Sequence, residues 1–558
     1  MNNSVKKLIE TCLIEAAQGL LKKRGILRES LPPIFISQPK KKEWGDLSTN
    51  FAFSLARVTG QSTSRIGEYL VSSLQDVDFL SRVEFAPPGF INFSLSPSYL
   101  EGTVKKILAQ GEEFTRFDLG KGKRIQVEFV SANPTGPLHI GHGRAAAFGD
   151  SLANILSKMG YSVEREYYIN DVGGQIKRLS SSVLARIRQL QGKNVALPEG
   201  GYKGEYLIEI AKKAKDSFGE ILEEEDEEKL LSLLGEFTVR EILEEIKKDL
   251  DEFGVKYDSW FRESSLYEKG DVPRLMSYLK DKGLIYEKDG ALWFKTSSIL
   301  KGEEDRVLRR KNGDYTYFAA DIAYHRNKFS RGFDYLIDIW GADHIGYVPR
   351  MKAAIQALGY PRESLRIIIY QLVSLIREGE KIPASTREGK FISLREVLRE
   401  VGKDACRFFF LSRTCDSHLD FDLEQAKKQT PENPVFYIQY AHARICSILE
   451  KAREKGIKME EFDEACLKLL KNPEEMELMK QLALLPDEVK EAAESLEPHR
   501  LTTYLENLAS LFHQFYTKHR VINEHEELTY ARLSLVKAIK IVLRDVLNLL
   551  GISAPRKM

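Results

Sequence analysis

Cysteine is scarce in this chain of 558 residues, and no two cysteines form a C-x-x-C pair. This scarcity disfavours both a disulfide-stapled fold and a structural zinc site, because each needs cysteines in close sets. Long apolar runs are missing too, since no segment approaches the roughly 18 residues of a membrane-spanning helix. The first 20 residues also lack a secretion signal. We therefore expect a cytoplasmic protein with no membrane partner and five reduced cysteines, namely Cys12, Cys406, Cys415, Cys446 and Cys466.

An excess of charge of one sign is also absent. The 83 Lys and Arg residues balance 82 Asp and Glu residues, which leaves a net charge of +1. Any nucleic-acid partner must therefore be recognised by individually placed side chains and not by bulk attraction. With 43% hydrophobic and 30% charged residues, the composition is that of an ordinary folded chain and excludes low-complexity and disordered classes.

The distribution of apolar residues divides the chain into four parts. Residues 1–117 predict a small α+β domain, because helical spacing alternates with short apolar runs. Residues 118–375 alternate strands with amphipathic helices, which is typical of a Rossmann-like α/β parallel sheet, and residues 176–282 are charge-dense and predict a helical insertion. Residues 376–430 form a connector, and residues 431–558 predict an all-α helical domain.

Three local expectations can be checked directly against a structure. Residues 47–58 and 64–74 have the spacing of helices. Residues 367–376 form an apolar run that predicts one strand.

The most informative segment joins a strand to a helix through a tight turn. Residues 125–131 alternate apolar and polar side chains as a strand does, and residues 152–159 carry helical spacing. The turn Asn133–Pro137 separates them, and Pro137 suits the first positions of a helix. His139 and His142 then stand three residues apart at the start of that helix.

This arrangement suits a bound anion. A helix start offers free N–H groups and about half a positive charge, so it favours a phosphate group. His139 and His142 would add hydrogen-bond donors, while Gly141 and Gly143 leave room for a flat base. The plainer interpretation is that the two histidines only cap the helix. The coincidence of strand, proline turn and H-x-G-H favours a nucleoside triphosphate site.

The string HIGH at 139–142 resembles the signature of class I aminoacyl-tRNA synthetases, and SANPTGPLHIGHGR at 131–144 resembles its arginyl-tRNA synthetase form. Further similarities to that family run from end to end: GDLSTN at 45–50, APPGFINF at 86–93, YINDVGGQ at 168–175, YFAADIAY at 317–324, WGADH at 340–344, PVFYIQYAHAR at 434–444 and SAPRKM at 553–558.

The resemblance implies a function and partners for each part of the chain. The expected reaction activates L-arginine with ATP and Mg²⁺ and transfers it to the 3′-terminal ribose of tRNA(Arg). The N-terminal domain would contact tRNA and the helical domain would bind the anticodon. We also expect a monomer that needs tRNA before it activates arginine.

The resemblance also assigns residues to the site. His139 and His142 would act on the phosphates as catalytic residues. Amino-acid binding falls to Glu128, Ser131 and Asn133 around the head group and to Tyr317 and Asp321 at the guanidinium. ATP binding is expected from the turn, the helix start and a second sheet edge: Pro134, Thr135, Gly136, Pro137, Leu138, Ile140, Gly141, Gly143, Gly341, Asp343 and His344.

An arginine pocket has a clear chemical requirement. The guanidinium is a planar fork of donors, so a selective pocket needs carboxylates in its plane and a flat group beside it. Tyr317 and Asp321, one helical turn apart, could supply both. Taken alone, Tyr317 could equally be a core aromatic, and Glu128 a strand residue that faces water.

The second class I signature is degenerate in this sequence. Pro383–Arg387 stands where a lysine-rich loop is expected, and Gly136 occupies the upstream position where some arginyl enzymes have a compensating lysine. We expect Lys381, Arg387 or Lys390 to reach the departing phosphates, because the developing charge needs a cation nearby. No protein metal ligand is expected.

The helical domain offers a candidate RNA surface. Tyr437, Tyr440 and Arg444 lie on one helix, and Phe512, Phe515 and Tyr516 precede a basic triplet. Exposed aromatics stack on splayed RNA bases, but aromatics at helical spacing are also common in a core. Only the resemblance favours tRNA binding at Tyr437, Tyr440 and Arg444.

Two other functions remain open at this stage. A small-molecule nucleotidyltransferase would use the same H-x-G-H turn, although it would not need the helical domain. A tRNA-binding protein without activity would explain the degenerate loop, although it would not need the intact turn.

Overall fold

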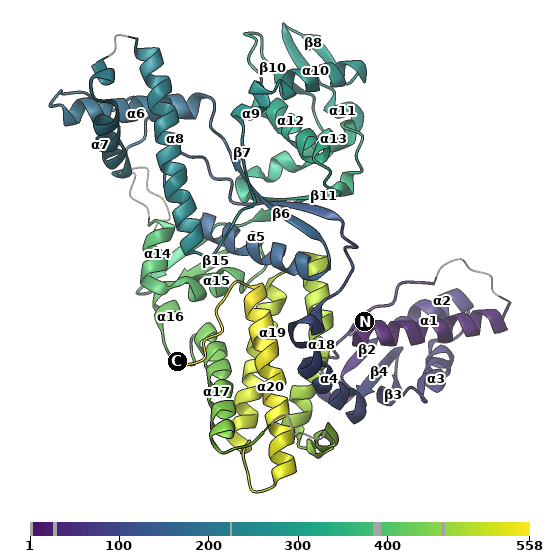
Figure 1. Cartoon of the computed structure of the whole chain (residues 1–558). Coiled ribbons are helices and arrows are strands. Elements are labelled where there is room, and N and C mark those ends of the chain that lie inside the picture. The colour runs from purple at the N-terminus through teal and green to yellow at the C-terminus, as the bar shows by residue number, and fades with distance from the viewer. Residues whose placement is uncertain (1–3, 26–30, 224–225, 383–391, 459–463) are drawn as a thin grey trace.

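The structure is a computed structural model that describes residues 4–25, 31–223, 226–382, 392–458 and 464–558. It consists of an N-terminal α+β unit, a central unit built on a parallel sheet, and a C-terminal helical bundle (Figure 1). The predicted fold class is therefore confirmed.

The N-terminal unit is an antiparallel sheet of order β1-β2-β4-β3 with helices beside it. The strands are β1 (Ile36–Ser37), β2 (Leu47–Thr49), β3 (Leu80–Ala86) and β4 (Phe90–Leu95), and the helices are α1 (Val5–Lys23), α2 (Phe51–Thr59) and α3 (Thr63–Leu74). The helix expected over 47–58 begins only at Phe51, because Leu47 and Thr49 pair with β4. Helix α4 (Pro97–Gln110) and two short 3-10 helices, η1 (Lys42–Trp44) and η2 (Gly111–Thr115), complete this part.

The central sheet is parallel throughout and has the order β12-β11-β5-β6-β7. Its strands are β5 (Arg124–Glu128), β6 (Ser162–Ile169), β7 (Ser259–Arg262), β11 (Tyr335–Gly341) and β12 (Leu365–Tyr370). The chain leaves β5 toward β6 on one side and returns as β11 on the other. The carboxyl end of β5 is therefore a topological switch point, where ligands of such sheets bind.

Helices α5 (Ile140–Lys158), α12 (Tyr317–Ser330) and α13 (Val348–Ala357) connect strands of this central unit. The helical insertion is shorter than the predicted 176–282. It comprises α6 (Gly174–Leu190), α7 (Tyr206–Phe218), η3 (Gly219–Glu223) and α8 (Glu227–Glu252). It ends there because residues 259–262 pair with β6 as the edge strand β7. Helices α9 (Ser264–Glu268) and α10 (Asp271–Asp281) follow the strand and return toward α12.

Two small sheets complete the central part. The first has the order β10-β9-β8, with β8 (Ile285–Lys288), β9 (Ala291–Phe294) and β10 (Arg306–Arg309), and α11 (Thr296–Ile299) lies between β9 and β10 in the chain. The 3-10 helices η4 (Ala342–Tyr347) and η5 (Arg362–Ser364) lie at the central sheet, where they contact β11. The second small sheet has the order β14-β13-β15, with β13 (Val373–Arg377), β14 (Glu380–Ile382) and β15 (Leu419–Asp422), near α14 (Leu394–Val401), α15 (Lys403–Leu411) and α16 (Leu423–Lys427). The single strand predicted over 367–376 is wrong, because β12 pairs in the central sheet and β13 pairs in the second small sheet.

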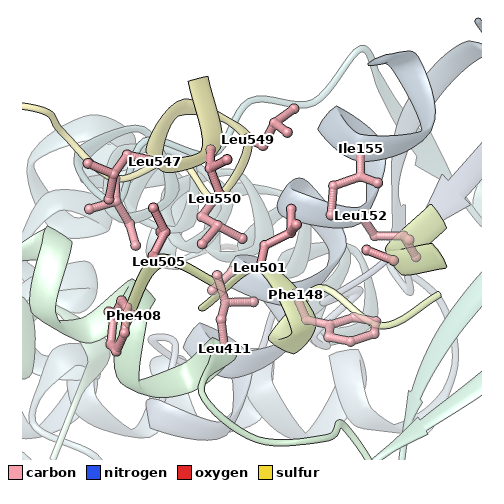
Figure 2. Packing of buried hydrophobic residues seen from close by; sticks show 14 of the residues in the cluster. Phe148, Leu152, Ile155, Phe408, Leu411, Leu501, Leu505, Leu547, Leu549 and Leu550 are labelled. Carbon is pink, nitrogen blue, oxygen red and sulfur yellow. The ribbon is translucent and has the colours of Figure 1, made fainter. Parts of the chain in front are cut away.

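The C-terminal bundle contains α17 (Pro434–Glu454), η7 (Glu464–Leu469), α18 (Pro473–Ser495), α19 (His499–Lys518) and α20 (Glu526–Leu549). Helix α5 is buried along most of its length and packs directly on this bundle. Figure 2 shows the contact, which joins side chains of α5, α15, α19 and the end of α20: Phe148, Leu152, Ile155, Phe408, Leu411, Leu501, Leu505, Leu547, Leu549 and Leu550. The bundle therefore fixes the helix that begins at the candidate site.

None of the described helices combines the length and apolarity that a bilayer span would need.

Gln126 lies in the central strand β5 and gives a stability prediction. Its side chain is fully buried, and among the described residues neither amide atom has a hydrogen-bond partner. A buried polar group without a partner costs about 1–3 kcal/mol. Gln126→Met keeps the side-chain length and is expected to raise the free energy of unfolding by about 1 kcal/mol or more. A lowered midpoint in urea-induced unfolding would contradict this expectation.

Candidate active site

The start of α5 forms a cap made of both histidines. His139 is the N-cap residue, and its Nδ1 accepts a hydrogen bond from the Gly141 N–H at 3.1 Å. The Nδ1 of His142 accepts from the His139 N–H at 3.3 Å, and the two rings stack with centroids 3.6 Å apart. The capping interpretation and the anion interpretation are therefore compatible. Pro137, which was expected in the first helical positions, lies two residues before the cap.

The protonation of the two rings follows from this geometry. Burial lowers the pKa of His139, and burial followed by the proximity of His139 lowers the pKa of His142 well below its usual value. Both rings are therefore neutral near pH 7. Because each Nδ1 is an acceptor in the cap, each proton lies on Nε2, which leaves two Nε2–H donors available for a ligand.

The two glycines of the H-x-G-H-G segment lie where neighbouring side chains leave little room for a Cβ atom. A Cβ on Gly143 would lie 2.6 Å from Leu394 Cδ1, and a Cβ on Gly141 would lie 3.0 Å from the His139 ring. The side chains of Leu138 and Ile140 are fully buried, so only their backbone could reach a nucleotide. At both glycines a side chain would therefore meet atoms of the protein itself.

The turn Asn133–Pro137, called the nucleotide turn below, lies between β5 and this cap. Asn133 is exposed, Pro134 is buried, and Thr135, Gly136 and Pro137 are partly exposed. The Thr135 N–H donates to the Asn133 carbonyl at 2.7 Å. Exposed backbone therefore borders the helix start.

Glu128 does not face the site in the way the resemblance implied. It is 7% exposed, and both carboxylate oxygens have protein partners: Ser131 Oγ donates at 2.9 Å and Lys328 Nζ donates at 2.6 Å. The reading of Glu128 as a strand residue facing water is also wrong. Ser131 in turn accepts from the Tyr168 N–H at 3.1 Å, so Glu128 ties β5 to β6 next to the pocket.

Val130 and Ser131 adopt the left-handed backbone region, with φ of 67° and 40°. This conformation is unfavourable for residues with side chains and is found where the surroundings enforce it, often at functional sites. Here the hydrogen bonds of Ser131 hold the turn directly after β5.

Tyr317 and Asp321 both lie at the start of α12, one helical turn apart. Tyr317 is 53% exposed, so it is not a core aromatic. Asp321 lies one turn further and accepts a hydrogen bond from the Tyr347 hydroxyl. Burial raises the pKa of Asp321. An open ring and a partly buried carboxylate therefore share one end of this helix.

A second carboxylate of this pocket, Glu263, was missed. Glu263 follows β7 and is 2% exposed. Its pKa is raised to about 7, chiefly by burial and also by the nearby charges of Asp321 and Asp171, against the lowering effect of the Tyr168 hydroxyl. The available signal was an acidic residue directly after a short aromatic strand, but this strand lay inside the segment predicted to be helical.

Asp171, which lies close to Glu263, is already paired with an arginine of the protein. It accepts from Arg262 Nε at 2.7 Å and from the Ser264 N–H at 2.9 Å. By contrast, Asp321 and Glu263 form no ion pair with any described residue. A buried and a partly buried carboxylate, neither paired with a cation of the described residues, create a site that favours a positively charged ligand.

The second sheet edge is formed by the end of β11. Gly341 is the last residue of that strand, and a Cβ there would lie 2.6 Å from Asp343 Oδ1. Asp343 and His344 are exposed, with His344 Nε2 3.3 Å from Asp343 Oδ2. The three predicted residues therefore form an open polar edge one strand away from the H-x-G-H cap.

The three candidate loop cations have different positions. Lys381 lies in β14, where its Nζ pairs with Asp420 Oδ1 at 3.0 Å on the surface. Exposed pairs of this kind contribute only about 0–1 kcal/mol, so the lysine can be released. Arg387 and Lys390 lie outside the described residues, as does the stretch Pro383–Arg387.

The tyrosines of α17 form a half-buried aromatic cluster. The guanidinium of Arg444 lies 5.0 Å from the Tyr440 ring and 5.2 Å from the Tyr516 ring, and the Tyr437 and His513 rings lie at a tilt with centroids 4.3 Å apart. Phe512 and Phe515 are fully buried, so for these two the core interpretation is correct. The predicted trio and Tyr516 remain partly accessible.

Among the described residues, no three His, Cys, Asp or Glu side chains are grouped as metal ligands.

Comparison with protein families agrees with this division of the chain. The Arginyl tRNA synthetase N terminal domain matches residues 3–95, the tRNA synthetases class I (R) catalytic domain matches residues 103–410, and the DALR anticodon binding domain matches residues 438–558. The fold and the H-x-G-H site are those of a class I aminoacyl-tRNA synthetase.

Individual relatives narrow this assignment. Curated arginine–tRNA ligases from Syntrophotalea carbinolica and Caldanaerobacter subterraneus subsp. tengcongensis are each 47% identical over 99–100% of this chain and the whole of the relative. A solved Campylobacter jejuni structure described as an arginyl-tRNA synthetase is 38% identical, covers 83% of this chain and all of that chain, and has a TM-score of 0.76. Thermus thermophilus arginyl-tRNA synthetase shares the fold, with 24% identity, 99% and 100% coverage and a TM-score of 0.77. The chain belongs to the arginyl-tRNA synthetase family.

Proposed function

We propose that the protein is an arginine–tRNA ligase that works through the site described above. The arginine carboxylate attacks the α-phosphate of ATP, the bond to the β-phosphate breaks, and arginyl-adenylate and pyrophosphate form. A hydroxyl of the 3′-terminal ribose of tRNA(Arg) then attacks the arginyl carbonyl, and AMP leaves. The observation that carries this proposal is the pair Asp321 and Glu263, two carboxylates close enough for the charge of Asp321 to raise the pKa of Glu263, and neither forms an ion pair with a described residue.

In this proposal the pocket recognises the planar guanidinium group of arginine. Asp321 and Glu263 accept the guanidinium N–H groups, and the exposed ring of Tyr317 lies flat beside them. Lysine would leave acceptors unpaired, which costs about 1–3 kcal/mol for each lost partner. Asn133 and Ser131, at the end of β5, are the nearest candidates for the amino-acid head group.

The phosphates belong to the cap of α5. The Nε2–H groups of His139 and His142 and the helix dipole would stabilise the charge that develops as pyrophosphate leaves. Mg²⁺ enters as part of the ATP substrate, held by phosphate oxygens. Lys381, Arg387 or Lys390 supplies the further cation. Gly341, Asp343 and His344 face the ribose.

The C-terminal bundle would receive the anticodon loop. Tyr437, Tyr440 and Arg444 combine aromatic faces with a cation, which suits splayed bases and phosphates. The N-terminal unit would contact another part of the tRNA. None of the five cysteines, all of which the structure describes, forms a disulfide, and this supports a reducing compartment such as the cytoplasm. Action as a monomer stays a prediction.

One assay tests the function as a whole. The protein is incubated with labelled arginine, ATP, Mg²⁺ and total tRNA, and acid-precipitable label is counted, with labelled lysine as the control. We expect arginine to be attached to tRNA and lysine to be excluded. Adenylylation of another compound would instead favour the nucleotidyltransferase alternative, and binding of tRNA without charging would favour the inactive one.

The affinity for arginine is expected to rise with pH between 6 and 8. The pKa of Glu263 is raised to about 7, so the group is mostly protonated at pH 6 and cannot pair with a guanidinium. Arginine binding favours the deprotonated form, and the KM for arginine should be about tenfold lower at pH 8 than at pH 6. Pyrophosphate exchange with tRNA present measures this.

The variant Glu263→Gln has no carboxylate to titrate at this position and should remove most of this pH dependence. The KM for ATP, measured in the same assay, is the internal control. A wild-type arginine KM that is equal at both pH values would contradict the assignment of Glu263.

A further inference from the structure

A residue of the helical insertion forms a hydrogen bond with the nucleotide turn. The Tyr206 hydroxyl, at the first residue of α7, donates a hydrogen bond to the Thr135 carbonyl. The ring also lies against the neighbouring glycine, since a Cβ on Gly136 would be 3.4 Å from Tyr206 Oη and 3.5 Å from Cζ. Burial raises the pKa of the Tyr206 hydroxyl, so this group remains a donor at any physiological pH.

Helix α7 is a firm support for this contact. Leu207, Ile210, Ala211 and Ala214 are buried, and α7 packs on α6 and α8 within the insertion. Tyr206 is therefore an anchored side chain that reaches the turn and not a mobile surface group.

The insertion also forms ion pairs with α14, the helix that follows the degenerate signature loop. Arg395 on α14 pairs with Asp249 through Nε at 2.5 Å and with Glu245 through Nη1 at 2.8 Å, both on α8. Figure 1 shows α14 at the foot of α8.

Helix α14 is in turn joined to the H-x-G-H segment. The Leu394 N–H donates to the Leu138 carbonyl at 2.8 Å, and Ser393 pairs with His139 as an antiparallel bridge.

These contacts close a ring around one cavity. The ring runs from the nucleotide turn through Tyr206 to the insertion, through Arg395 to α14, and back to the H-x-G-H segment. The cavity it encloses has a volume of about 390 Å³ and is lined by Pro137, Tyr206, Ile210, Ile242, Ser393 and Arg395, among others. The charged pairs on its wall are satisfied within the protein, which indicates a structural joint and not a ligand site.

We propose that Tyr206 is a positioning residue for ATP, through which the helical insertion sets the backbone of the nucleotide turn next to the H-x-G-H cap. This inference rests on the proposed function and assigns a role to the insertion that the sequence left unexplained. Loss of the hydroxyl would leave the Thr135 carbonyl without its donor and allow the turn to move. The guanidinium of arginine would be bound by other elements, α12 and the residue after β7, and only the head group would meet the turn, at Asn133. Arginine binding should therefore change much less than ATP binding.

The test is Tyr206→Phe in the full-length chain, which removes only the hydroxyl. We expect the KM for ATP in tRNA-dependent pyrophosphate exchange to rise about three- to tenfold, which corresponds to the loss of one hydrogen bond. The KM for arginine should stay within about twofold, and the unfolding midpoint should be unchanged. Tyr202→Phe is the matched control, because Tyr202 lies four residues away and its hydroxyl has no hydrogen bond among the described residues.

Any of three results would overturn the proposal. An unchanged KM for ATP would show that the turn does not need this donor. An equal rise in both KM values, or the same effect in Tyr202→Phe, would show a general loss of structure. The failure of the wild-type protein to charge tRNA with arginine would instead refute the proposed function, and that assay is performed first.

Discussion

The substitution Asp321→Asn is expected to lower kcat/KM for arginine by about a hundredfold or more, with little change in the KM for ATP. The side chain keeps its size, so α12 and the Tyr347 contact can persist. The loss is electrostatic, because a buried carboxylate that pairs with a cation contributes about 2–5 kcal/mol to binding. A neutral amide also turns one donor toward the donors of the guanidinium.

Pyrophosphate exchange with saturating tRNA and ATP measures this effect. Asp314→Asn is the matched control, since Asp314 lies shortly before α12 but is exposed and bonded only to its own loop. Similar losses in both variants would contradict the role of Asp321, as would a rise in the KM for ATP equal to that for arginine.

The substitution Lys328→Met is expected to reduce the free energy of unfolding by about 3–5 kcal/mol. Lys328 is fully buried on α12, and its Nζ donates to Glu128 at 2.6 Å and to Asp338 at 2.8 Å. Asp338 also accepts from His325 Nε2 at 2.8 Å. Removal of the ammonium leaves two carboxylates in an apolar interior with one nearby imidazole, so both the fold and the position of α12 should suffer.

Urea-induced unfolding measures this loss. Lys381→Met is the control, because its ion pair is exposed and should change stability by less than about 1 kcal/mol. The triple variant Lys328→Met with Glu128→Gln and Asp338→Asn removes the unpaired charges and should recover part of the loss. A single variant as stable as the wild type would refute the importance of this buried network.

The site residues that sequence reasoning identified share one property: they lie next to short strings with strong local signals. The H-x-G-H cap is built by residues three apart, and Tyr317 and Asp321 lie on one turn of one helix. Turn chemistry and helical spacing are local, so they predicted the helix start at the H-x-G-H string, while the family resemblance singled out Tyr317 and Asp321. Local patterns also predicted the parallel sheet and the helical C-terminal bundle.

Residues that depend on distant partners were harder to predict. Glu128 looked like a ligand contact because it ends β5, but its oxygens are taken by Ser131 and by Lys328, which lies 200 residues away. Glu263 was missed because its strand β7 is only four residues long and follows a long helical insertion. Such a short strand is stabilised by its pairing with β6, and the sequence near Glu263 contains no pattern from which this pairing could be predicted.

The sequence alone therefore determined the fold class, the helix start at the H-x-G-H string and the family to which the chain belongs, because each is encoded by residues near one another. Only the tertiary structure decided which carboxylates face the pocket, why the motif glycines are small, and how the insertion reaches the nucleotide turn through Tyr206. The physical reason is that burial and pairing are properties of the folded assembly. A carboxylate becomes a binding group or an internal support according to the partners that other segments bring to it.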